Sequence, residues 1–407
     1  MFKSIKMAPA DPILGLSEIY DADERKHKIN LGIGVYVDKI KNTPVLASVK
    51  QAEEWLLKHE TTKNYLSIEG MHSFNTATQC LLFGINDDDS SIISKERIRT
   101  VQAPGGTGAL RIAAEFIVKN TKSKRIWISS PSWVNHKNIF TAAGLEICTY
   151  PYYNNTTHSL NFDELYSNLK NVKPNDVVLF HCCCHNPTGI DPNTEQWNIL
   201  SELSEKNGWL PLFDLAYQGF SRGLKEDITG LYIFCKKNPE LIVCNSYSKN
   251  FGLYNERIGA CTVITNNNDD SNRVLSQLRV IIRGNYSNPP AHGASIVSLI
   301  LNNKKLRSIW EEELKTMREH INYMRKLFFN TLKNNNKNID FSFIKNQCGM
   351  FSFIGLNENQ VMQLRDTFGV YLVGAGRINL AGLSNDNIVY VCRSIIKTLN
   401  RNLTTSK

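Results

Sequence analysis

The sequence predicts an α/β protein, with a large domain in which helices flank a mostly parallel sheet, plus a smaller α+β domain. Between about residues 95 and 265, short apolar runs alternate with longer amphipathic segments, which is the pattern of repeated β-α-β units. A long, charged helical pattern then begins near Trp310 and is too long for one small domain. Short alternating segments and a closing amphipathic helix follow it, as is typical of a smaller α+β unit.

Local patterns of apolar and polar residues predict the individual strands and helices of the large domain. Apolar runs of strand length are followed by polar or glycine-rich residues, and helix-length segments place apolar residues at intervals of three and four. We expect strands within 97–102, 125–130, 176–184, 209–217 and 241–248, and helices over 109–120 and 194–208. Runs of asparagine at 266–268 and 334–336 predict exposed loops.

Composition limits the classes of protein. The chain has 407 residues, 42% of them apolar, which at roughly 100 to 200 residues per domain indicates two or three packed units. No segment approaches the roughly 18 apolar residues of a spanning helix, and residues 1–12 lack a signal core, so we expect a cytoplasmic protein without a membrane partner. The ten cysteines form no CxxC pair and are expected to be reduced thiols.

The net charge of +9 is compatible with nucleic acid, an anionic membrane surface or small acidic substrates. A nucleic-acid binder would need clustered basic residues, which the sequence lacks. We therefore expect no nucleic-acid partner.

The segment Ala103 to Gly108 follows the first apolar run and leads into a predicted helix. Its backbone N–H groups and the Thr107 hydroxyl would lie at the positive end of that helix, where anions bind. The segment is therefore either a phosphate cradle or only a tight turn. It contains neither GxGxxG nor GK[ST], so it is neither a dinucleotide fingerprint nor a Walker loop.

The cysteines of residues 182–184 lie between His181 and His185, an arrangement that superficially suggests a metal site. Alternate residues of a strand point to opposite faces, so we expect small thiols that fill a strand interior and no metal. Polar Asn186 follows, at the carboxyl end of this strand. In open parallel sheets ligands bind at that edge.

Two further strand ends carry ionisable residues. Asp214, followed by Tyr217, ends one strand, and on its own it could equally be a helix N-cap. Lys249 follows another strand, and Arg257 stands eight residues later. An amine that is partly desolvated near another cation is less basic and can form a Schiff base, whereas an isolated lysine is usually a solvated surface group.

Together these strand ends offer what pyridoxal phosphate requires: an amine for its aldehyde, a carboxylate for its pyridine nitrogen, donors for its phenolate oxygen, and several donors for its phosphate. The motifs around them, in chain order, are LGIGVYVD, PSWVNH, HNPTG, FDLAYQGF, NSYSKNFGLYNERIGA, YSNPP and GRINLAGL. In these motifs the sequence resembles the aspartate aminotransferases, class I enzymes of the fold-type-I pyridoxal phosphate group. The resemblance extends from Leu31 to the last helix.

The resemblance implies roles for individual residues. Lys249 would form the internal aldimine and then move the substrate's α-proton, Asp214 would pair with the pyridine nitrogen, and Tyr217 would donate to the phenolic oxygen. These three would be the catalytic residues. The cofactor-binding residues would be Gly105, Gly106, Thr107, Trp133, His136, Asn186, Asp214, Tyr217, Ser246, Ser248, Lys249, Arg257 and, reaching across from a second subunit, Tyr65.

Two arginines would select the substrate, because a guanidinium pairs with a carboxylate through two parallel hydrogen bonds. Arg377 would hold the α-carboxylate, and Arg283 of the partner subunit would hold the side-chain carboxylate. The substrate-binding residues would be Ile33, Gly34, Trp133, Asn186, Arg283 and Arg377. The implied function is reversible transfer of the amino group from L-aspartate to 2-oxoglutarate, by a ping-pong mechanism.

The resemblance also implies an organisation into a homodimer with shared active sites. The large cofactor-binding domain would span 44–316, the small domain 11–43 with 317–407, and residues 1–10 would form an arm on the partner subunit. One departure is Gly105, where many relatives carry serine, so a hydroxyl donor to the phosphate is missing and we expect weaker cofactor retention.

Several alternatives stay open on the sequence alone. An aromatic or broad-specificity aminotransferase could use the same scaffold, and so could a pyridoxal phosphate lyase or decarboxylase, although Arg283 argues against the latter two. A non-enzymatic binding protein would be expected to have lost Lys249, Asp214 or Arg377, and none is lost. A nicotinamide-dependent dehydrogenase lacks its fingerprint in this sequence.

Overall fold

The computed structural model describes residues 2–8, 14–38, 42–84 and 94–404. These residues fall into two compact units, one within 43–186 and 190–319, the other within 1–42, 187–189 and 320–407. Among the described residues, no helix is both long and apolar enough to cross a membrane.

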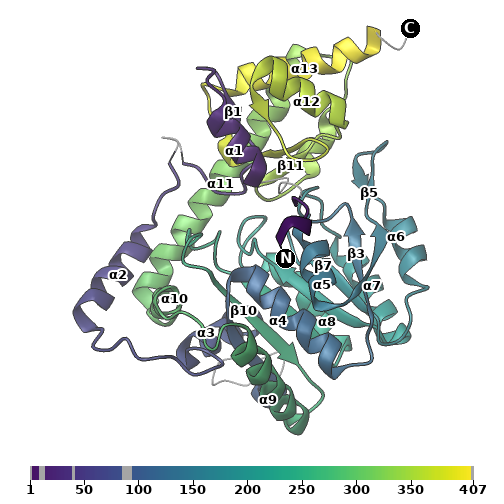
Figure 1. Cartoon of the computed structure of the whole chain (residues 1–407). Coiled ribbons are helices and arrows are strands. Elements are labelled where there is room, and N and C mark those ends of the chain that lie inside the picture. Colours follow the sequence, from purple (N-terminus) through teal and green to yellow (C-terminus); the bar gives the residue numbers. More distant parts are fainter. Residues whose placement is uncertain (1, 9–13, 39–41, 85–93, 405–407) are drawn as a thin grey trace. The chain divides into compact units, whose positions relative to one another are not determined.

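Helices and strands alternate along most of the chain (Figure 1). The helices are α1 Leu14–Ala22, α2 Ala47–His59, α3 His72–Phe83, α4 Gly105–Asn120, α5 Asn135–Ala143, α6 Phe162–Leu169, α7 Thr194–Asn207, α8 Thr229–Lys237, α9 Asn268–Asn285, α10 His292–Asn302, α11 Lys304–Asn335, α12 Glu358–Phe368 and α13 Ile388–Thr404. The strands are β1 Ile29–Asn30, β2 Ile98–Pro104, β3 Arg125–Ser130, β4 Glu146–Pro151, β5 Tyr153–Asn154, β6 Ser159–Leu160, β7 Val177–His181, β8 Leu210–Leu215, β9 Leu241–Ser246, β10 Ile258–Ile264, β11 Phe351–Phe353, β12 Val370–Tyr371 and β13 Arg377–Asn379.

The larger unit is built on a seven-stranded sheet in the order β2-β10-β9-β8-β7-β3-β4. Strands β9, β8, β7, β3 and β4 run parallel, and β10 is antiparallel to both of its neighbours. The predicted α/β class with a mostly parallel sheet is confirmed. Because β10 runs the opposite way, its first residues lie at the edge where the other strands end.

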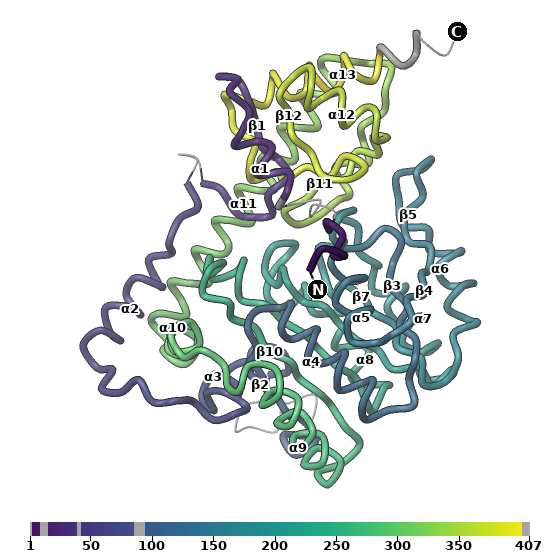
Figure 2. Tube along the Cα trace, viewed as in Figure 1, coloured from purple at the N-terminus to yellow at the C-terminus, as the bar shows by residue number. Residues whose placement is uncertain are grey.

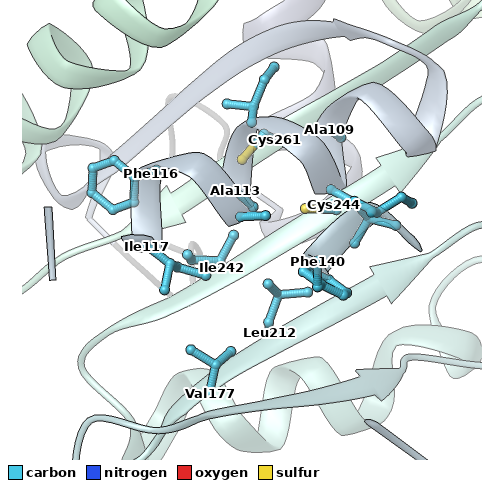
Figure 3. Packing of buried hydrophobic residues seen from close by; sticks show 14 of the residues in the cluster. Ala109, Ala113, Phe116, Ile117, Phe140, Val177, Leu212, Ile242, Cys244 and Cys261 are labelled. Atoms are coloured by element: carbon cyan, nitrogen blue, oxygen red, sulfur yellow. The ribbon is translucent and has the colours of Figure 1, made fainter. Parts of the chain in front are cut away.

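Alternation along the strands places apolar side chains on both faces of the sheet. Leu212 and Ile242 lie in the core cluster beneath α4, which supplies apolar side chains at three- and four-residue spacing (Figure 3). On the opposite face, Phe180 lies 5.6 Å, between ring centroids, from both Trp197 of α7 and Phe234 of α8. The sheet is thus covered by helices on each side, which leaves its edge as the place for polar groups.

The smaller unit pairs strands from opposite ends of the chain (Figure 2). Strand β1 is parallel to β12, with Ile29 opposite Val370, and β11 is antiparallel to β13, with Phe353 opposite Arg377. Helices α12 and α13 belong to the same unit. This mixture of short strands and helices fits the predicted α+β character.

The prediction of exposed loops is wrong for the part of each asparagine run that lies in a helix, namely Asn268 in α9 and residues 334–335 in α11, whereas Asn266, Asn267 and Asn336 lie outside the helices. Asn267 is the N-cap of α9, because its side chain accepts a hydrogen bond from the backbone N–H of Asp270, and Asn268 begins the helix. Asn335 ends α11. Asparagine can accept a hydrogen bond from a free N–H at a helix start, so a polar run can also mark a helix boundary.

Candidate active site

The carboxyl ends of β7, β8 and β9 bring several predicted site residues to one edge of the sheet. His181 is in register with Asp214, and Asp214 with Cys244, two residues before Ser246. Asp214 lies inside β8 and not beyond it, so it is no helix N-cap. Ser246 is the last residue of β9, and Lys249 lies in the turn that follows.

A cradle for an anion is formed where β2 ends and β10 begins, since Pro104 is in register with Ile258 and Arg257 precedes that residue. The glycines lie in the first turn of α4, so the predicted turn before the helix is in fact its start. Gly105 has φ of +75°, and a Cβ there would lie 2.4 Å from Nη2 of Arg257. The guanidinium of Arg257 therefore lies directly against the start of α4.

Two serines, one at the end of β9 and one in the turn that follows, complete the cradle. A Cβ on Gly106 would lie 3.1 Å from Cβ of Ser246, and the Ser246 hydroxyl accepts a hydrogen bond from the backbone N–H of Ser248 at 3.2 Å. Arg257 donates to Oγ of Ser248 at 3.3 Å and to the carbonyl of Tyr254 at 2.9 Å. A helix N-terminus, a guanidinium and hydroxyls thus converge, which is the donor set of a phosphate site.

A relay of hydrogen bonds leads from Asp214 to the loop that carries Asn186. Nε2 of His136 donates to Oδ2 of Asp214 at 2.8 Å, and Nδ1 of His136 lies 2.9 Å from Oγ of Ser132. Oγ of Ser132 lies 3.1 Å from Nε2 of His181, whose Nδ1 accepts from the backbone N–H of Asn186 at 3.3 Å. All donors in this relay are satisfied when His181 is neutral and carries its proton on Nε2.

The electrostatics agree with this proton arrangement. Burial and the neighbouring His136 lower the pKa of His181 to about 3, so the ring is neutral at physiological pH. Burial alone would raise the pKa of Asp214, but the hydrogen bond from His136, with a smaller contribution from the charge of Lys249, brings it below its ordinary value. Asp214 is therefore a buried anion, which can pair with a protonated ring nitrogen.

The aromatic residues frame the amine and the carboxylate. Nζ of Lys249 lies 4.9 Å from the ring centroid of Tyr217, a cation–π contact. Trp133 meets His136 edge to face, with the ring centroids 5.2 Å apart. Asn186 and Tyr217 are buried, with 6% of the surface of each exposed. The larger unit therefore holds an amine, an anionic carboxylate and an anion cradle on connected elements.

The smaller unit contains the other group of predicted residues. Arg377 is 3% exposed, donates from Nη2 to the carbonyl of Gly32 at 2.5 Å, and lies over the ring of Phe351 at 4.2 Å. Nδ2 of Asn379 donates to the carbonyls of Ile33 and Val35, both at 2.7 Å. The segment with Ile33 and Gly34 is thus fixed to β13.

Tyr65 and Arg283 lie on the surface of the larger unit. Tyr65 is 92% exposed. Arg283 is exposed in the last turn of α9, and its guanidinium contacts the Ser287 hydroxyl of its own chain. Neither side chain therefore lies with the residues that the strand ends bring together.

Sequence reasoning missed three residues that hold this site in shape. Ser132 joins His136 to His181. Asp191 accepts the backbone N–H groups of Cys184 and His185 at 2.7 and 2.9 Å, and so fixes the loop before Asn186. Asp227 accepts four backbone N–H groups from residues 219–223, after Tyr217. Ser132 belongs to the PSWVNH motif, which could have indicated it, but the two aspartates had no local signal.

The cysteine run differs from its prediction. Strand β7 ends at His181, so Cys182–Cys184 follow the strand instead of filling it, and Cys184 has φ of +52°. The hydrogen bonds to Asp191 hold this bend. Cys183, Cys184 and Asp227 offer ligand atoms within 4.8 Å of one another, but both oxygens of Asp227 already accept backbone hydrogen bonds. That carboxylate is committed to the loop.

Comparison with known proteins extends over the whole chain. The family model described as "Aminotransferase class I and II" matches residues 26–395. The aspartate aminotransferase of Escherichia coli (strain K12) is 57% identical over 399 residues, which cover 98% of this chain and 100% of that protein.

Solved structures agree. An aromatic-amino-acid aminotransferase from Burkholderia pseudomallei, covalently bound to pyridoxal phosphate, has a TM-score of 0.94 at 42% identity and covers 98% of this chain and 99% of its own. An aspartate aminotransferase from the cytoplasm of Saccharomyces cerevisiae has a TM-score of 0.94 at 36% identity, with 98% of each chain covered. The chain therefore belongs to the aminotransferase class I and II family.

Proposed function

We propose that this enzyme exchanges the amino group between L-aspartate and 2-oxoglutarate, giving oxaloacetate and L-glutamate. One observation carries the proposal: an amine on Lys249, the anionic carboxylate of Asp214 and a phosphate cradle at Arg257 lie on connected elements at one edge of the sheet. The aspartate aminotransferase from Escherichia coli, 57% identical over its full length, supports the choice of substrates.

The residues present fit pyridoxal phosphate. A dianionic phosphate matches the N-terminus of α4, the Arg257 guanidinium and the hydroxyls of Ser246 and Ser248. A buried anionic carboxylate with a fixed donor matches a protonated pyridine nitrogen, which would otherwise be costly to bury. When bound, the cofactor supplies an electron sink for the bond that breaks at the substrate's α-carbon.

The chain's own residues have separate roles in the reaction. Lys249 would hold the cofactor through its amine and, when that amine is free, would accept and return the substrate's α-proton on Nζ. Asp214 would keep the cofactor's ring nitrogen protonated, His136 would keep Asp214 ionised, and Trp133 would stack on the ring. Asn186 and Tyr217 would donate hydrogen bonds to the phenolic oxygen. Phosphate binding would use Gly105, Gly106, Thr107, Ser246, Ser248 and Arg257, with Tyr65 of a second subunit.

Substrate recognition is assigned to two guanidinium groups. We assign Arg377 to the α-carboxylate, because its hydrogen bond to Gly32 and its contact with Phe351 fix its position. We assign Arg283 of the other subunit to the side-chain carboxylate. Ile33 and Gly34 would line the site and move when a dicarboxylate binds.

We propose that the enzyme is a cytoplasmic homodimer with shared sites; the exposure of Tyr65 and Arg283 in a single chain is compatible with their reaching the site of a partner. We propose the functional division of the chain as a cofactor domain over 44–316, a small domain over 11–43 and 317–407, and an arm over 1–10. Phe2 and Met7 of that arm are 78% and 97% exposed, as expected for residues that pack on a partner, whereas residues 1, 9 and 10 lie outside the described residues. The ten free cysteines suit a reducing compartment.

The test is steady-state transamination by the purified holoenzyme, with L-aspartate or L-phenylalanine as donor and 2-oxoglutarate as acceptor. We expect kcat/KM to be at least about 100-fold higher for aspartate, because an unpaired guanidinium in the site disfavours an apolar side chain. Arg283→Leu should lower kcat/KM for aspartate and not for phenylalanine, Arg377→Lys should lower both, and Lys249→Ala should abolish turnover. A preference for phenylalanine would favour the aromatic aminotransferase alternative, which several structural neighbours represent.

A further inference from the structure

The two residues assigned to the neighbouring site belong to segments that are tied together within one chain. Asn288, five residues after Arg283, donates from Nδ2 to the carbonyl of Leu66, the residue after Tyr65, at 3.1 Å. This hydrogen bond connects the segment of Tyr65 to the loop that follows α9. The exposed side chains of Tyr65 and Arg283 are therefore carried by segments that are hydrogen-bonded to each other.

Gln102 of β2 is a buried residue that connects the same two segments. Its side chain is 0% exposed and accepts from the backbone N–H of Met71 at 3.1 Å, while it donates to the carbonyl of Pro290 at 2.7 Å. Its backbone N–H donates to the carbonyl of Glu69 at 2.9 Å, and its carbonyl accepts from the Tyr286 hydroxyl at 3.2 Å. One residue of the central sheet thus holds both segments.

A second connection between the two segments is the partly exposed ion pair between Glu69 and Arg279. Nε of Arg279 lies 3.0 Å from Oε2 of Glu69, and Nη2 lies 2.6 Å from Oε1, so the pair is bidentate. The hydrogen bond from Arg279 lowers the pKa of Glu69, which is therefore ionised at neutral pH. Both side chains are partly exposed, Arg279 to 45% and Glu69 to 26%. An exposed ion pair of this kind contributes little to the free energy of unfolding. Its role therefore lies in how it orients the two side chains and the segments that carry them.

Arg279 and Arg283 are four residues apart on α9 and share one face of the helix. Glu69 neutralises Arg279, whereas among the described residues Arg283 has no acidic partner. Without Glu69, two neighbouring cations would repel each other, and both would be available to a dicarboxylate. The ion pair thus ties this face of α9 to the segment of Glu69 and keeps Arg279 from competing with Arg283 for a carboxylate.

We propose that Glu69, Arg279 and Gln102 are positioning residues that present Tyr65 and Arg283 of one chain to its neighbour as a single rigid element. This inference rests on the proposed function, in which Tyr65 reaches the phosphate and Arg283 the side-chain carboxylate. Its consequence is that cofactor retention and dicarboxylate recognition depend on the same exposed ion pair.

The test uses the holoenzyme with Glu69→Gln, compared with Glu202→Gln as a matched control, because Glu202 forms a partly exposed ion pair with Lys237 elsewhere in the larger unit. For Glu69→Gln we expect KM for L-aspartate to rise about fivefold, which corresponds to the loss of one well-ordered exposed pair. We expect kcat to change less than about twofold, KM for L-phenylalanine to stay unchanged, and the dissociation constant of pyridoxal phosphate to rise. The double variant Glu69→Arg with Arg279→Glu should restore much of the wild-type behaviour.

The inference is overturned if Glu69→Gln behaves like Glu202→Gln, or if KM rises equally for aspartate and phenylalanine. It is also overturned if the exchanged pair gives no recovery, because a loss due to general loosening would not depend on the pairing of charges. Arg283→Leu separates this result from the proposed function. If that variant leaves KM for aspartate unchanged, the assignment of Arg283 itself is wrong.

Discussion

Nε2 of His136 lies 2.8 Å from Oδ2 of Asp214, and both side chains are buried. In His136→Leu the carboxylate keeps its burial but loses its donor. A hydrogen bond to a buried charge is worth about 1.5 to 3 kcal/mol, so we expect the free energy of unfolding to fall by about 2 kcal/mol at pH 7. Urea denaturation of the holoenzyme measures this difference.

The pH dependence of that loss identifies the carboxylate as its source. In the wild type the folded pKa of Asp214 is depressed, so its stabilising contribution is present above the unfolded value near 3.9 and is lost as the pH falls through the folded pKa. Without the His136 donor, burial raises the pKa of Asp214 in the variant, so the carboxyl takes up a proton as the pH falls and the cost of the buried charge disappears. The deficit of His136→Leu should therefore shrink as the pH falls towards 4. Tyr150→Phe, which removes a buried neutral hydrogen bond to the carbonyl of Leu179, is the control and should show a deficit independent of pH. Parallel pH profiles for the two variants would contradict the prediction.

The sequence suggests that a serine at position 105 would strengthen cofactor binding, whereas the backbone conformation of Gly105 predicts the opposite. A serine would add a hydroxyl to the cradle, but at φ of +75° any Cβ is strained, and it would lie 2.4 Å from Nη2 of Arg257. We expect Gly105→Ser and Gly105→Ala to weaken binding of pyridoxal phosphate alike, by about tenfold for a strain of about 1 to 2 kcal/mol. Titration of the apoenzyme measures the affinity. Tighter binding by the serine variant alone would show that the missing hydroxyl outweighs the strain.

Asn379 supports the segment that carries Ile33 and Gly34. Besides its two hydrogen bonds to the carbonyls of Ile33 and Val35, Oδ1 accepts from the backbone N–H of Ala381 at 3.0 Å. Asn379→Leu leaves these groups without partners, and we expect a loss of about 3 kcal/mol in the free energy of unfolding. Denaturation by urea measures it.

A matched control is Asn198→Leu, because the Asn198 amide donates only to the carbonyl of Thr194 within an exposed helical turn. A surface substitution of this kind should change stability by less than about 0.5 kcal/mol. Equal losses in Asn379→Leu and Asn198→Leu would show that Asn379 does not hold the segment.

The sequence was most informative where local pattern and chemistry coincide. Alternating apolar runs indicated β7, β8 and β9, and the polar residues at their ends indicated Asp214 and Lys249. It was least informative where a residue acts through distant backbone. Asp227 holds residues 219–223 by accepting their N–H groups, and such a contact depends on how a loop folds back, which no spacing of residue types records. The start of α9 was predicted as a loop for a related reason, because an asparagine can lie in a loop or cap a helix equally well.

The low pKa of His181 predicts that the protein loses stability in mild acid. Its folded pKa of about 3 lies below the ordinary unfolded value of about 6.5. Below pH 6.5 the unfolded chain therefore binds a proton that the folded chain cannot bind, and stability falls as the pH decreases from 6.5 towards 3. Between pH 7 and pH 5 this one histidine should cost about 2 kcal/mol of unfolding free energy.

The variant His181→Gln cannot titrate but keeps an amide that can hydrogen-bond to Ser132. We expect it to lose about 2 kcal/mol less than the wild type between pH 7 and pH 5, whatever its stability at pH 7. Urea denaturation at both pH values and one protein concentration measures the difference, with Tyr150→Phe as the variant that retains every titrating histidine. If His181→Gln and Tyr150→Phe lose the same free energy on acidification, the ring of His181 takes up a proton in the folded protein, and the relay from Asp214 to Asn186 does not require it to be neutral.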